Sequence, residues 1–228
     1  MENASPPNIN VGFPTLQNQM KAILKTAIAI KSCHKYADRR QAQRDTWLKG
    51  VDTDFFFVIG DPEPLTESDL LYLPGRSDAF TDIAPKVLGA VEYALEENVT
   101  NLLVCDDDTY ISWPRMKESG FERFSYLGFV RNHGPWAYMQ GSCFWLDEQS
   151  IATLANLKEY MACRTPDDVA VGRCLTGVVP FTHEHRYQVG SPYPEPTQWP
   201  RKDNDIIACH KMNFMQMHTC HERLVTSA

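Results

Sequence analysis

The amino-acid sequence predicts an α/β fold with a parallel central sheet and helices on both of its faces. Short apolar segments of strand length alternate with segments of helical character between residues 26 and 105, an order that is typical of parallel strands joined by crossover helices. A triplet of aspartates, 106–108, follows the third apolar segment directly. Because ligands of such sheets bind beyond the carboxyl ends of the strands, we expect a site at this triplet.

Three buried strands are expected in the first half of the chain. Residues 27–30 (AIAI), 54–59 (DFFFVI) and 101–105 (NLLVC) are short apolar runs, which suit strands that are buried on both faces. The sequence Gly-Asp-Pro at 60–62 supplies the turn chemistry that ends the second of them.

Two helices are expected between these strands. Residues 36–48, rich in Arg, Gln and Ala, predict a helix with a polar face. A second helix is indicated by apolar residues that recur three and four positions apart on one face. These are Ala84, Val87, Leu88, Val91, Ala94 and Leu95. Pro85 is tolerated in the first turn of this helix, because an N–H at that position has no helical partner.

The second half of the chain is less regular. We expect strands at 126–130 and 138–146, a helix at 147–157, a capped helix start at 166–172, mostly loop at 177–205 and a helix at 212–224. Residues 1–24, without a sustained period, are expected to form an arm before a single domain that extends over residues 25–228.

Composition argues against nucleic-acid binding and membrane insertion. The chain has 228 residues, with 22 Lys and Arg against 29 Asp and Glu, and a formal net charge of −7. An acidic chain without a basic run has no electrostatic reason to hold a nucleic-acid backbone. No apolar stretch approaches the roughly 20 residues that a membrane-spanning helix needs. The 7 cysteines are scattered without Cys-x-x-Cys spacing, so a reduced, cytoplasmic protein is the simpler expectation, and a lumenal location would require an additional N-terminal anchor.

The aspartate triplet is the first candidate for chemistry. Three adjacent carboxylates repel one another unless a cation or hydrogen-bond donors compensate them. Side chains alternate along a strand, so Asp106 and Asp108 can share one face while Asp107 points elsewhere. Such oxygen ligands suit Mg²⁺ or Mn²⁺. The alternative is a solvated acidic loop at the end of a strand.

Clustered arginines form the second candidate. Arg39, Arg40 and Arg44 follow the first expected strand, and the last two of them face one way on a helix. Guanidinium groups in this place suit an anionic ligand, in particular a diphosphate. The alternative is a surface helix with salt bridges.

Two adjacent carboxylates, Asp167 and Asp168, stand at an expected helix start. They are either caps that complement the helix dipole, or one of them is a general base, which requires a substrate hydroxyl within hydrogen-bond reach.

Histidines and cysteines near the C-terminus give two further possibilities. The spacing of Cys209, His210, His218, Cys220 and His221 fits none of the usual ligand patterns of a structural zinc site. His210, however, follows the short apolar run 206–209 just as Asp108 follows the third strand. A neutral imidazole there would be a third metal ligand that adds no negative charge.

Several blocks occur in the order found in one enzyme family. The first is RRQAQRDTW at 39–47, and the others are 57–60, 80–86, 105–110, 138–146 and 166–172, with His210 and Met215 at the end. Together they resemble glycosyltransferase family 31, which includes β-1,3-galactosyl- and N-acetylglucosaminyltransferases, core-1 synthase and Fringe. The resemblance extends over about residues 26–224.

The resemblance implies a reaction and a GT-A fold, in which a single α/β domain has a mixed, mainly parallel central sheet. An inverting enzyme of this kind moves a hexose or N-acetylhexosamine from a UDP-sugar to a hydroxyl of an acceptor glycan or glycoconjugate, with Mn²⁺ (or Mg²⁺) and a β-1,3-type linkage. It also implies that Asp108 and His210 are metal ligands and that Asp107 contacts the nucleotide-sugar. Asp106 is implied to be a supporting carboxylate, both as a ligand of the metal and at the nucleotide-sugar. His183 and His185 are the competitors for the third metal ligand.

The same resemblance assigns the base and the cationic residues. Asp168 would be the general base, with Asp167 as the alternative. The residues expected to bind the nucleotide, or to order its site by packing, are Arg39, Arg40, Arg44 and Lys86. The family's Gly-Gly pair is reduced to Gly141-Ser142, which leaves the donor and the acceptor open. The rival functions are a metal-dependent phosphohydrolase and a non-catalytic module that binds nucleotide-sugars or glycans.

Overall fold

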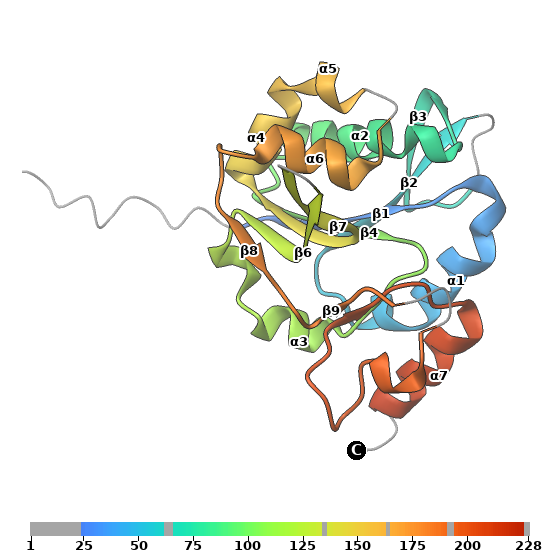
Figure 1. Ribbon diagram of the computed structural model, residues 1–228. Coiled ribbons are helices and arrows are strands. Elements are labelled where there is room, and N and C mark those ends of the chain that lie inside the picture. Colours follow the sequence, from blue (N-terminus) through green and yellow to red (C-terminus); the bar gives the residue numbers. More distant parts are fainter. Residues whose placement is uncertain (1–23, 62–65, 134–135, 163–164, 191–193, 226–228) are drawn as a thin grey trace, which may run out of the picture.

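The central sheet is mixed, and all but one of its strands run in the same direction. The computed structural model of the protein describes residues 24–61, 66–133, 136–162, 165–190 and 194–225, and residues 1–23 of the expected arm lie outside this part. Within the described residues, seven strands pair in the order β3-β2-β1-β4-β7-β6-β8 (Figure 1). Their bounds are Thr26–Lys31 (β1), Asp54–Asp61 (β2), Leu70–Ser77 (β3), Asn101–Asp106 (β4), Tyr126–His133 (β6), Trp136–Asp147 (β7) and Phe181–His183 (β8). Only β7 pairs antiparallel with both of its neighbours in this sheet, so the expected mixed, mainly parallel sheet is confirmed.

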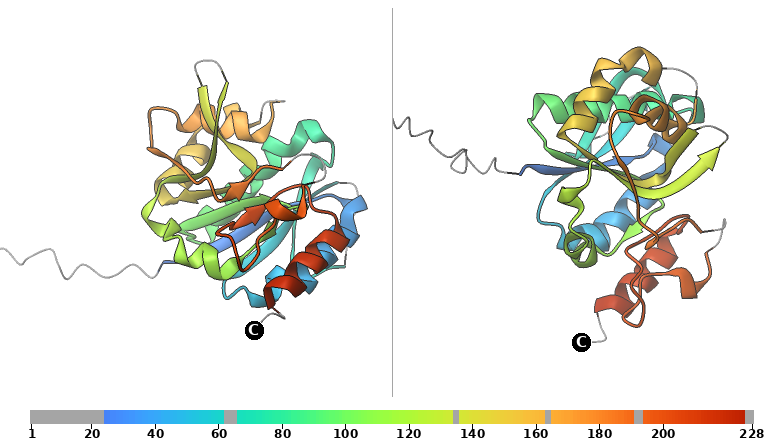
Figure 2. Two further views of the ribbon diagram at one scale, coloured as in Figure 1. Left: turned by 60° about the horizontal axis from the view of Figure 1, so that its bottom comes forward. Right: turned by 60° about the vertical axis from the view of Figure 1, so that its left-hand side comes forward.

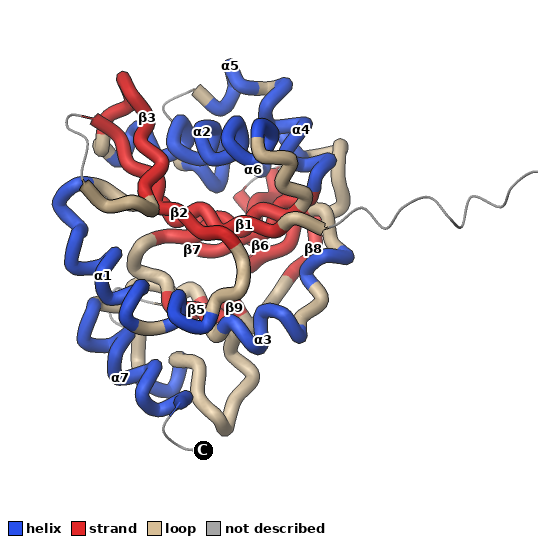
Figure 3. Tube along the Cα trace, turned by 180° about the vertical axis from the view of Figure 1, so that it is seen from behind, coloured by secondary structure: helices blue, strands red, loops and turns tan. Residues whose placement is uncertain are grey.

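Helices cover both faces of the sheet, as the sequence predicts (Figure 1). On one face lie α2 (Ile83–Glu96), α4 (Glu148–Asn156), α5 (Lys158–Met161) and α6 (Asp167–Leu175). On the other lie α1 (Ala37–Asp45), α3 (Trp113–Glu118) and α7 (Phe214–Val225), with α7 beside α1 (Figure 2). Between these last helices and the main sheet lies a small sheet of β5 (Tyr110–Ile111), β10 (Ala208–Cys209) and β9 (Tyr187–Gln188), in that order (Figure 3).

The apolar strands contribute side chains to two hydrophobic cores, one on each face of the main sheet. In β1, Ala27 and Ala29 pack into the core under α2, whereas Ile28 and Ile30 pack into the core on the other face. A strand that is apolar at every position is therefore buried on both sides. This alternation explains why the unbroken apolar run in the sequence predicts a central strand.

The amphipathic helix forms where it was expected, as α2. Its predicted apolar face is buried, with the exception of Leu95, which is 42% exposed. Leu95 stands in the last turn, so the packing surface ends before the helix does, and its place in the expected core was wrong.

Two strands of the main sheet were not expected. The edge strand β3 contains Pro74 and Gly75, and Pro is tolerated in a sheet mainly on an edge strand. At the opposite edge, β8 lies within the proline-rich segment 177–205, which is otherwise mostly loop as predicted. Within the described residues, no helix combines the length and the apolarity needed to cross a membrane.

The order of the strands positions the site. From β1 the chain adds β2 and β3 on one side and then places β4 on the other side of β1. Such a reversal is a topological switch point, where a crevice opens beyond the carboxyl ends of the two adjacent strands. Here those two strands end at Lys31 and Asp106.

Candidate functional site

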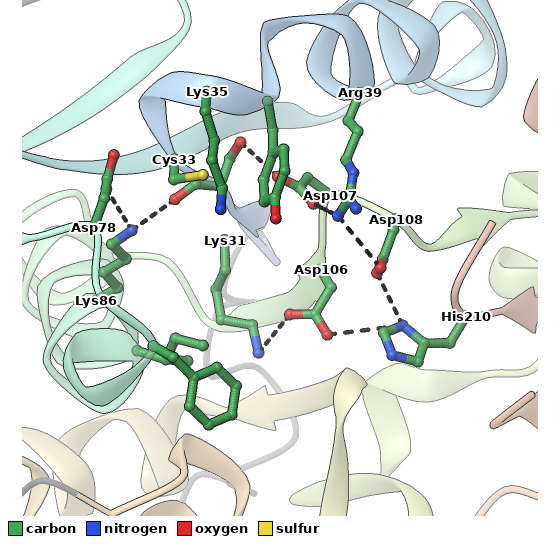
Figure 4. A pocket seen from close by; sticks show the side chains of 14 residues that line it. Lys31, Cys33, Lys35, Arg39, Asp78, Lys86, Asp106, Asp107, Asp108 and His210 are labelled. Carbon is green, nitrogen blue, oxygen red and sulfur yellow. Dashed lines mark hydrogen bonds and ion pairs between the residues drawn. The ribbon is translucent and has the colours of Figure 1, made fainter. Parts of the chain in front are cut away.

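A pocket of about 340 Å³ lies beyond the ends of β1 and β4. Its walls come from the end of β1, the start of α1, the segment before α2 and the first residues of α2, the aspartate triplet and the residue after β10. Of the residues singled out in the sequence, it brings together Arg39, Lys86, Asp106, Asp107, Asp108 and His210 (Figure 4). Its volume lies within the range of about 300–1,000 Å³ that is usual for small-molecule sites.

Asp106, Asp108 and His210 form a cluster on one side of this pocket (Figure 4). His210 Nδ1 lies 3.1 Å from Asp108 Oδ1 and 3.8 Å from Asp106 Oδ2. One ligand atom from each residue lies within 4.8 Å of the others. The described residues contain no second group of three His, Cys, Asp or Glu side chains arranged in this way.

The donor set of this cluster fits a divalent cation such as Mn²⁺ or Mg²⁺. Carboxylate oxygens suit both ions, and an imidazole nitrogen suits Mn²⁺ in addition. Although burial opposes its charge, the hydrogen bond with His210 and the charge of Arg39 hold the pKa of Asp108 below its ordinary value. The Asp108 carboxylate is therefore ionised near neutral pH, as a metal ligand must be.

Two backbone links bring His210 to the cluster from the far end of the chain. Cys209 pairs with Tyr110 between β10 and β5, and the N–H of Met212 donates to the carbonyl of Asp108 at 2.9 Å. Between them Lys211 adopts a left-handed conformation, with φ 63°, which costs free energy for a non-glycine residue. The segment that carries His210 is thus held against the triplet on both sides of the histidine.

The two competing histidines lie elsewhere. His183, at the end of β8, accepts a hydrogen bond from the N–H of Val130 at 3.0 Å. The side chain of His185 is 73% exposed, near Glu184 and Asp205. Neither belongs to the cluster of Asp106, Asp108 and His210.

Asp107 points away from the cluster. It accepts hydrogen bonds from Ser32 Oγ at 2.7 Å and from Arg39 Nη1 at 3.0 Å, and burial raises its pKa to about 6. The Arg39 guanidinium lies 3.9 Å from the centroid of the Tyr36 ring and 3.4 Å from Asp108 Oδ2. Asp107 therefore fixes the guanidinium group of Arg39 at the wall of the pocket.

The other two arginines are held by acidic residues outside the pocket wall. Arg40, fully buried, donates to both carboxylate oxygens of Glu67 and to the carbonyl of Cys33 at 2.6 Å. Arg44 pairs with Glu67 and also with Asp69. For these two residues the geometry favours the salt-bridged helix, and packing that orders the start of α1, over direct contact with a ligand.

Lys86 contributes to the pocket together with Asp78, which sequence reasoning missed. Lys86 Nζ donates to Asp78 Oδ1 at 2.6 Å and to the carbonyl of Ser32 at 2.7 Å. Asp78 also accepts hydrogen bonds from the backbone N–H groups of His34 and Gly60. Although burial opposes its charge, these bonds lower the pKa of Asp78 to about 2. No single segment of the sequence indicates this hydrogen-bonded group around Asp78, because its members come from four segments.

The carboxylates at the start of α6 are not capping groups of the usual kind. Asp167 is buried and pairs with Lys31 Nζ at 2.5 Å. Asp168 is half-buried and accepts from the N–H of its neighbour Val169 at 2.8 Å. Burial, followed by the charge of Asp167, raises the pKa of Asp168.

Two glycines let these carboxylates approach the sheet. A Cβ at Gly172 of α6 would lie 2.4 Å from the Cβ of Tyr138 in β7, so only glycine lets the helix pack this closely. A Cβ at Gly141 would lie 3.2 Å from both carboxylate oxygens of Asp167 and 3.4 Å from the Cβ of Asp168. Gly141, the glycine kept from the family's pair, therefore borders both carboxylates.

The histidines and cysteines of the C-terminal helix serve packing. Tyr110 Oη and His221 Nδ1 lie 3.0 Å apart, and Cys220 is buried with its Sγ 3.3 Å from the carbonyl of Pro200. Among the described residues, these side chains do not assemble with Cys209 and His218 into a metal site.

Comparison with known proteins supports the family resemblance. No protein-family model matches the chain. Beta-1,3-galactosyltransferase 6 of Mus musculus is 26% identical over an alignment of 206 residues, and this alignment covers 71% of this chain. The chain matches 63% of the length of this mouse relative. The resemblance to glycosyltransferase family 31 that the sequence motifs indicate is thereby confirmed.

A solved structure shares this fold at low sequence identity. A glycosyltransferase involved in the glycosylation of the major capsid of PBCV-1 has a TM-score of 0.52 at 9% identity, over 87% of this chain and 98% of that chain. The galactosyltransferase LgtC, in complex with donor and acceptor sugar analogs, has a TM-score of 0.49 at 9% identity over 87% of this chain and 96% of that chain, too distant to support an inference. The GT-A fold expected from the sequence is confirmed by the order of the sheet and by the first likeness.

Proposed function

We propose that the protein is a metal-dependent glycosyltransferase that moves a sugar from a UDP-sugar to a hydroxyl of an acceptor glycan. The observation that carries this proposal is the cluster of Asp106, Asp108 and His210 at the switch point of a GT-A sheet, on the wall of a pocket. The similarity to a mouse protein named as a beta-1,3-galactosyltransferase supports it. Galactose is therefore the first donor sugar to test, with β-1,3 as the first linkage.

The pocket suits a nucleoside diphosphate. A cation held by Asp106, Asp108 and His210 would stabilise the charge that develops on the diphosphate as it leaves. Arg39, fixed by Asp107, adds a guanidinium on the same wall, and guanidinium groups match phosphate oxygens well. Phe80, which is 75% exposed, lines the pocket and offers a flat apolar surface to a base or a sugar ring.

Asp168 is the proposed general base. Asp167 is already engaged in an ion pair with Lys31, whereas Asp168 is half-buried and accepts hydrogen bonds from backbone N–H groups, that of Val169 among them. A raised pKa brings a carboxylate closer to the working pH of a base.

The reaction needs one base on the acceptor side. Asp168 would take the proton of the acceptor hydroxyl while that oxygen bonds to the anomeric carbon. The bond from this carbon to the UDP oxygen breaks on the opposite face, so the anomeric configuration inverts, as it does in the displacement by inverting glycosidases. UDP leaves with the bonding electron pair.

A thermal unfolding screen tests donor binding. UDP-galactose, UDP-glucose and their N-acetylated counterparts are added with MnCl₂ or with EDTA. A ligand at 100 times its Kd stabilises the folded state by about 2.7 kcal/mol, which for a chain of this size raises Tm by roughly 5–10 °C. We expect at least one UDP-sugar to do so with Mn²⁺ and not with EDTA. If none of them raises Tm in either condition, the proposed donor class is wrong.

A further inference from the structure

Lys31 is buried between Asp106, which belongs to the candidate metal cluster, and Asp167, which begins α6. Its Nζ lies 2.8 Å from Asp106 Oδ1, 2.5 Å from Asp167 Oδ2 and 2.8 Å from the carbonyl oxygen of Gly141. The side chain is 5% exposed. These contacts join β1 to β4, to β7 and to the start of α6, and Figure 4 shows the link to Asp106 at the edge of the pocket.

The ammonium group has no remaining donor for a ligand. A lysine ammonium has three N–H donors, and three acceptors surround this one at hydrogen-bond distance. Its two carboxylate partners, Asp106 and Asp167, compensate the charge of this buried ammonium group. Lys31 is thus a cation that contacts protein groups and is unavailable to a phosphate.

Its position links the two functions that we assign to this site. Asp106 turns Oδ1 to Lys31 and Oδ2 towards His210, 3.8 Å away. Asp167 precedes Asp168, the proposed base, and Gly141 borders both of these carboxylates. One side chain therefore holds the metal-side carboxylate and the start of the helix that carries the base.

We propose that Lys31 is a positioning residue that joins the candidate metal cluster to the base-bearing start of α6 and sets how tightly the cluster binds a divalent cation. This inference rests on the proposed roles of Asp106 and Asp168. The ammonium offsets part of the charge of Asp106 and occupies one of its two oxygens. Its removal frees that oxygen and leaves Asp106 more negative, so the cluster gains affinity for a cation.

At Asp167, the other carboxylate that Lys31 contacts, removal of Lys31 is unfavourable. Without Lys31, the buried Asp167 carboxylate has no cation, and an uncompensated buried charge is strongly destabilising. A lysine with a merely structural role would lower stability and leave cation affinity unchanged or weaker. A lysine that bridges the two groups lowers stability and tightens cation binding at the same time.

Calorimetric titration with MnCl₂ alone, on the full chain without nucleotide, separates these roles. We expect Lys31→Met to bind Mn²⁺ at least about fivefold more tightly than the wild type, and Lys31→Arg, which keeps the charge, to stay within about threefold of it. Lys117→Met is the matched control, because Lys117 is 47% exposed and pairs only with the surface carboxylate Asp52 among the ion pairs described. Its Mn²⁺ affinity should stay within about twofold of the wild type.

A second pair of variants covers the case in which Lys31→Met does not fold. Asp167→Asn removes the carboxylate that Lys31→Met leaves uncompensated, so the double variant should unfold at a higher temperature than Lys31→Met alone. The double variant should also bind Mn²⁺ at least about fivefold more tightly than Asp167→Asn. A double variant that is less stable than Lys31→Met would overturn the bridge, and so would Mn²⁺ binding that is unchanged, weaker or absent in both Lys31→Met backgrounds.

These outcomes are distinct from those of the proposed function. A wild type that binds Mn²⁺ and transfers no sugar contradicts the glycosyltransferase proposal, yet the comparison of Mn²⁺ affinities still decides the role of Lys31. A wild type that transfers sugar, with unchanged Mn²⁺ affinity in Lys31→Met, contradicts the bridge alone.

Discussion

Lys31 and Asp106 are partners in the register of two parallel strands, and their side chains form an ion pair of 2.8 Å. Each is the last residue of its strand, β1 or β4. The N–H of Asp107 then donates to the carbonyl of Lys31 at 3.1 Å, which turns the chain into the rest of the triplet. The register of the sheet thus decides which carboxylate meets the buried ammonium and which ones remain for a cation.

Asp108→Asn should remove Mn²⁺-dependent binding of UDP. The amide keeps the shape of the side chain and loses the charge that holds a cation. Calorimetry with UDP and MnCl₂ measures the effect, and Asp52→Asn is the control, because the Asp52 side chain is 63% exposed and pairs with Lys117. An Asp108→Asn variant that keeps the UDP affinity of the wild type would show that this residue is not a ligand.

Asp168→Asn should lower kcat by at least about 10²-fold, the usual scale for loss of a general base. Binding of the UDP-sugar should change little, because Asp168 is not among the residues that line the pocket. Steady-state kinetics and donor titration check the two parts separately. If Asp167→Asn abolishes turnover while Asp168→Asn is mild, the base has been assigned to the wrong neighbour.

His210→Ala should weaken Mn²⁺ binding at least about tenfold, since even changes behind the ligands of a metal site cost that much. His183→Ala and His185→Ala are matched controls, because both residues lie outside the cluster. Circular dichroism confirms that each variant is folded. Equal Mn²⁺ affinity in His210→Ala and the wild type, or a loss confined to one of the two controls, would exclude His210 as the third ligand.

Asp78 should make the protein sensitive to acid. Its pKa in the folded state is about 2, below the ordinary value of 3.8, so the ionised form stabilises the fold above pH 4, and this contribution is lost as the pH falls from about 4 to 2. The contribution amounts to about 2 kcal/mol. Urea unfolding at several pH values should therefore show that the free energy of unfolding decreases less steeply below pH 4 in Asp78→Asn than in the wild type.

Asp203→Asn is the control for this pH dependence, because the Asp203 side chain is 68% exposed and pairs with Arg201. The free energy of unfolding of Asp203→Asn should decrease below pH 4 as it does in the wild type. An Asp78→Asn variant whose free energy of unfolding falls with pH as steeply as that of the wild type would refute the assignment.

The sequence predicts the elements whose signals are local. The apolar pattern of the run 27–30 and of the helix α2 predicts their burial from a few neighbouring residues. The triplet 106–108 likewise stands at the end of an apolar strand. His210 could be linked to the triplet because a short strand also precedes it, and the structure places it 3.1 Å from Asp108. These features need only periodicity and the rule that parallel strands end at one edge.

Other features depend on partners that lie far apart in the chain. Lys31 is 110 residues from Gly141 and 136 from Asp167, so no local pattern reveals its bridge, although its place at the end of an apolar strand is a weak signal. Arg40 and Arg44 resemble anion-binding residues until Glu67 and Asp69 are brought beside them by the fold. The edge strand β3 lacks alternation, because Pro74 and Gly75 interrupt it.

The most direct test of the proposed function is release of UDP by the wild-type chain from the UDP-sugar that stabilises it best. The reaction is followed with MnCl₂ or EDTA, in the presence and absence of a panel of mono- and disaccharide glycosides, and the linkage in the product is read by proton NMR. We predict that UDP release requires both Mn²⁺ and one of the acceptors, and that the new glycosidic bond has the inverted anomeric configuration. Release of free phosphate without any acceptor, or a product with retained configuration, would contradict the account.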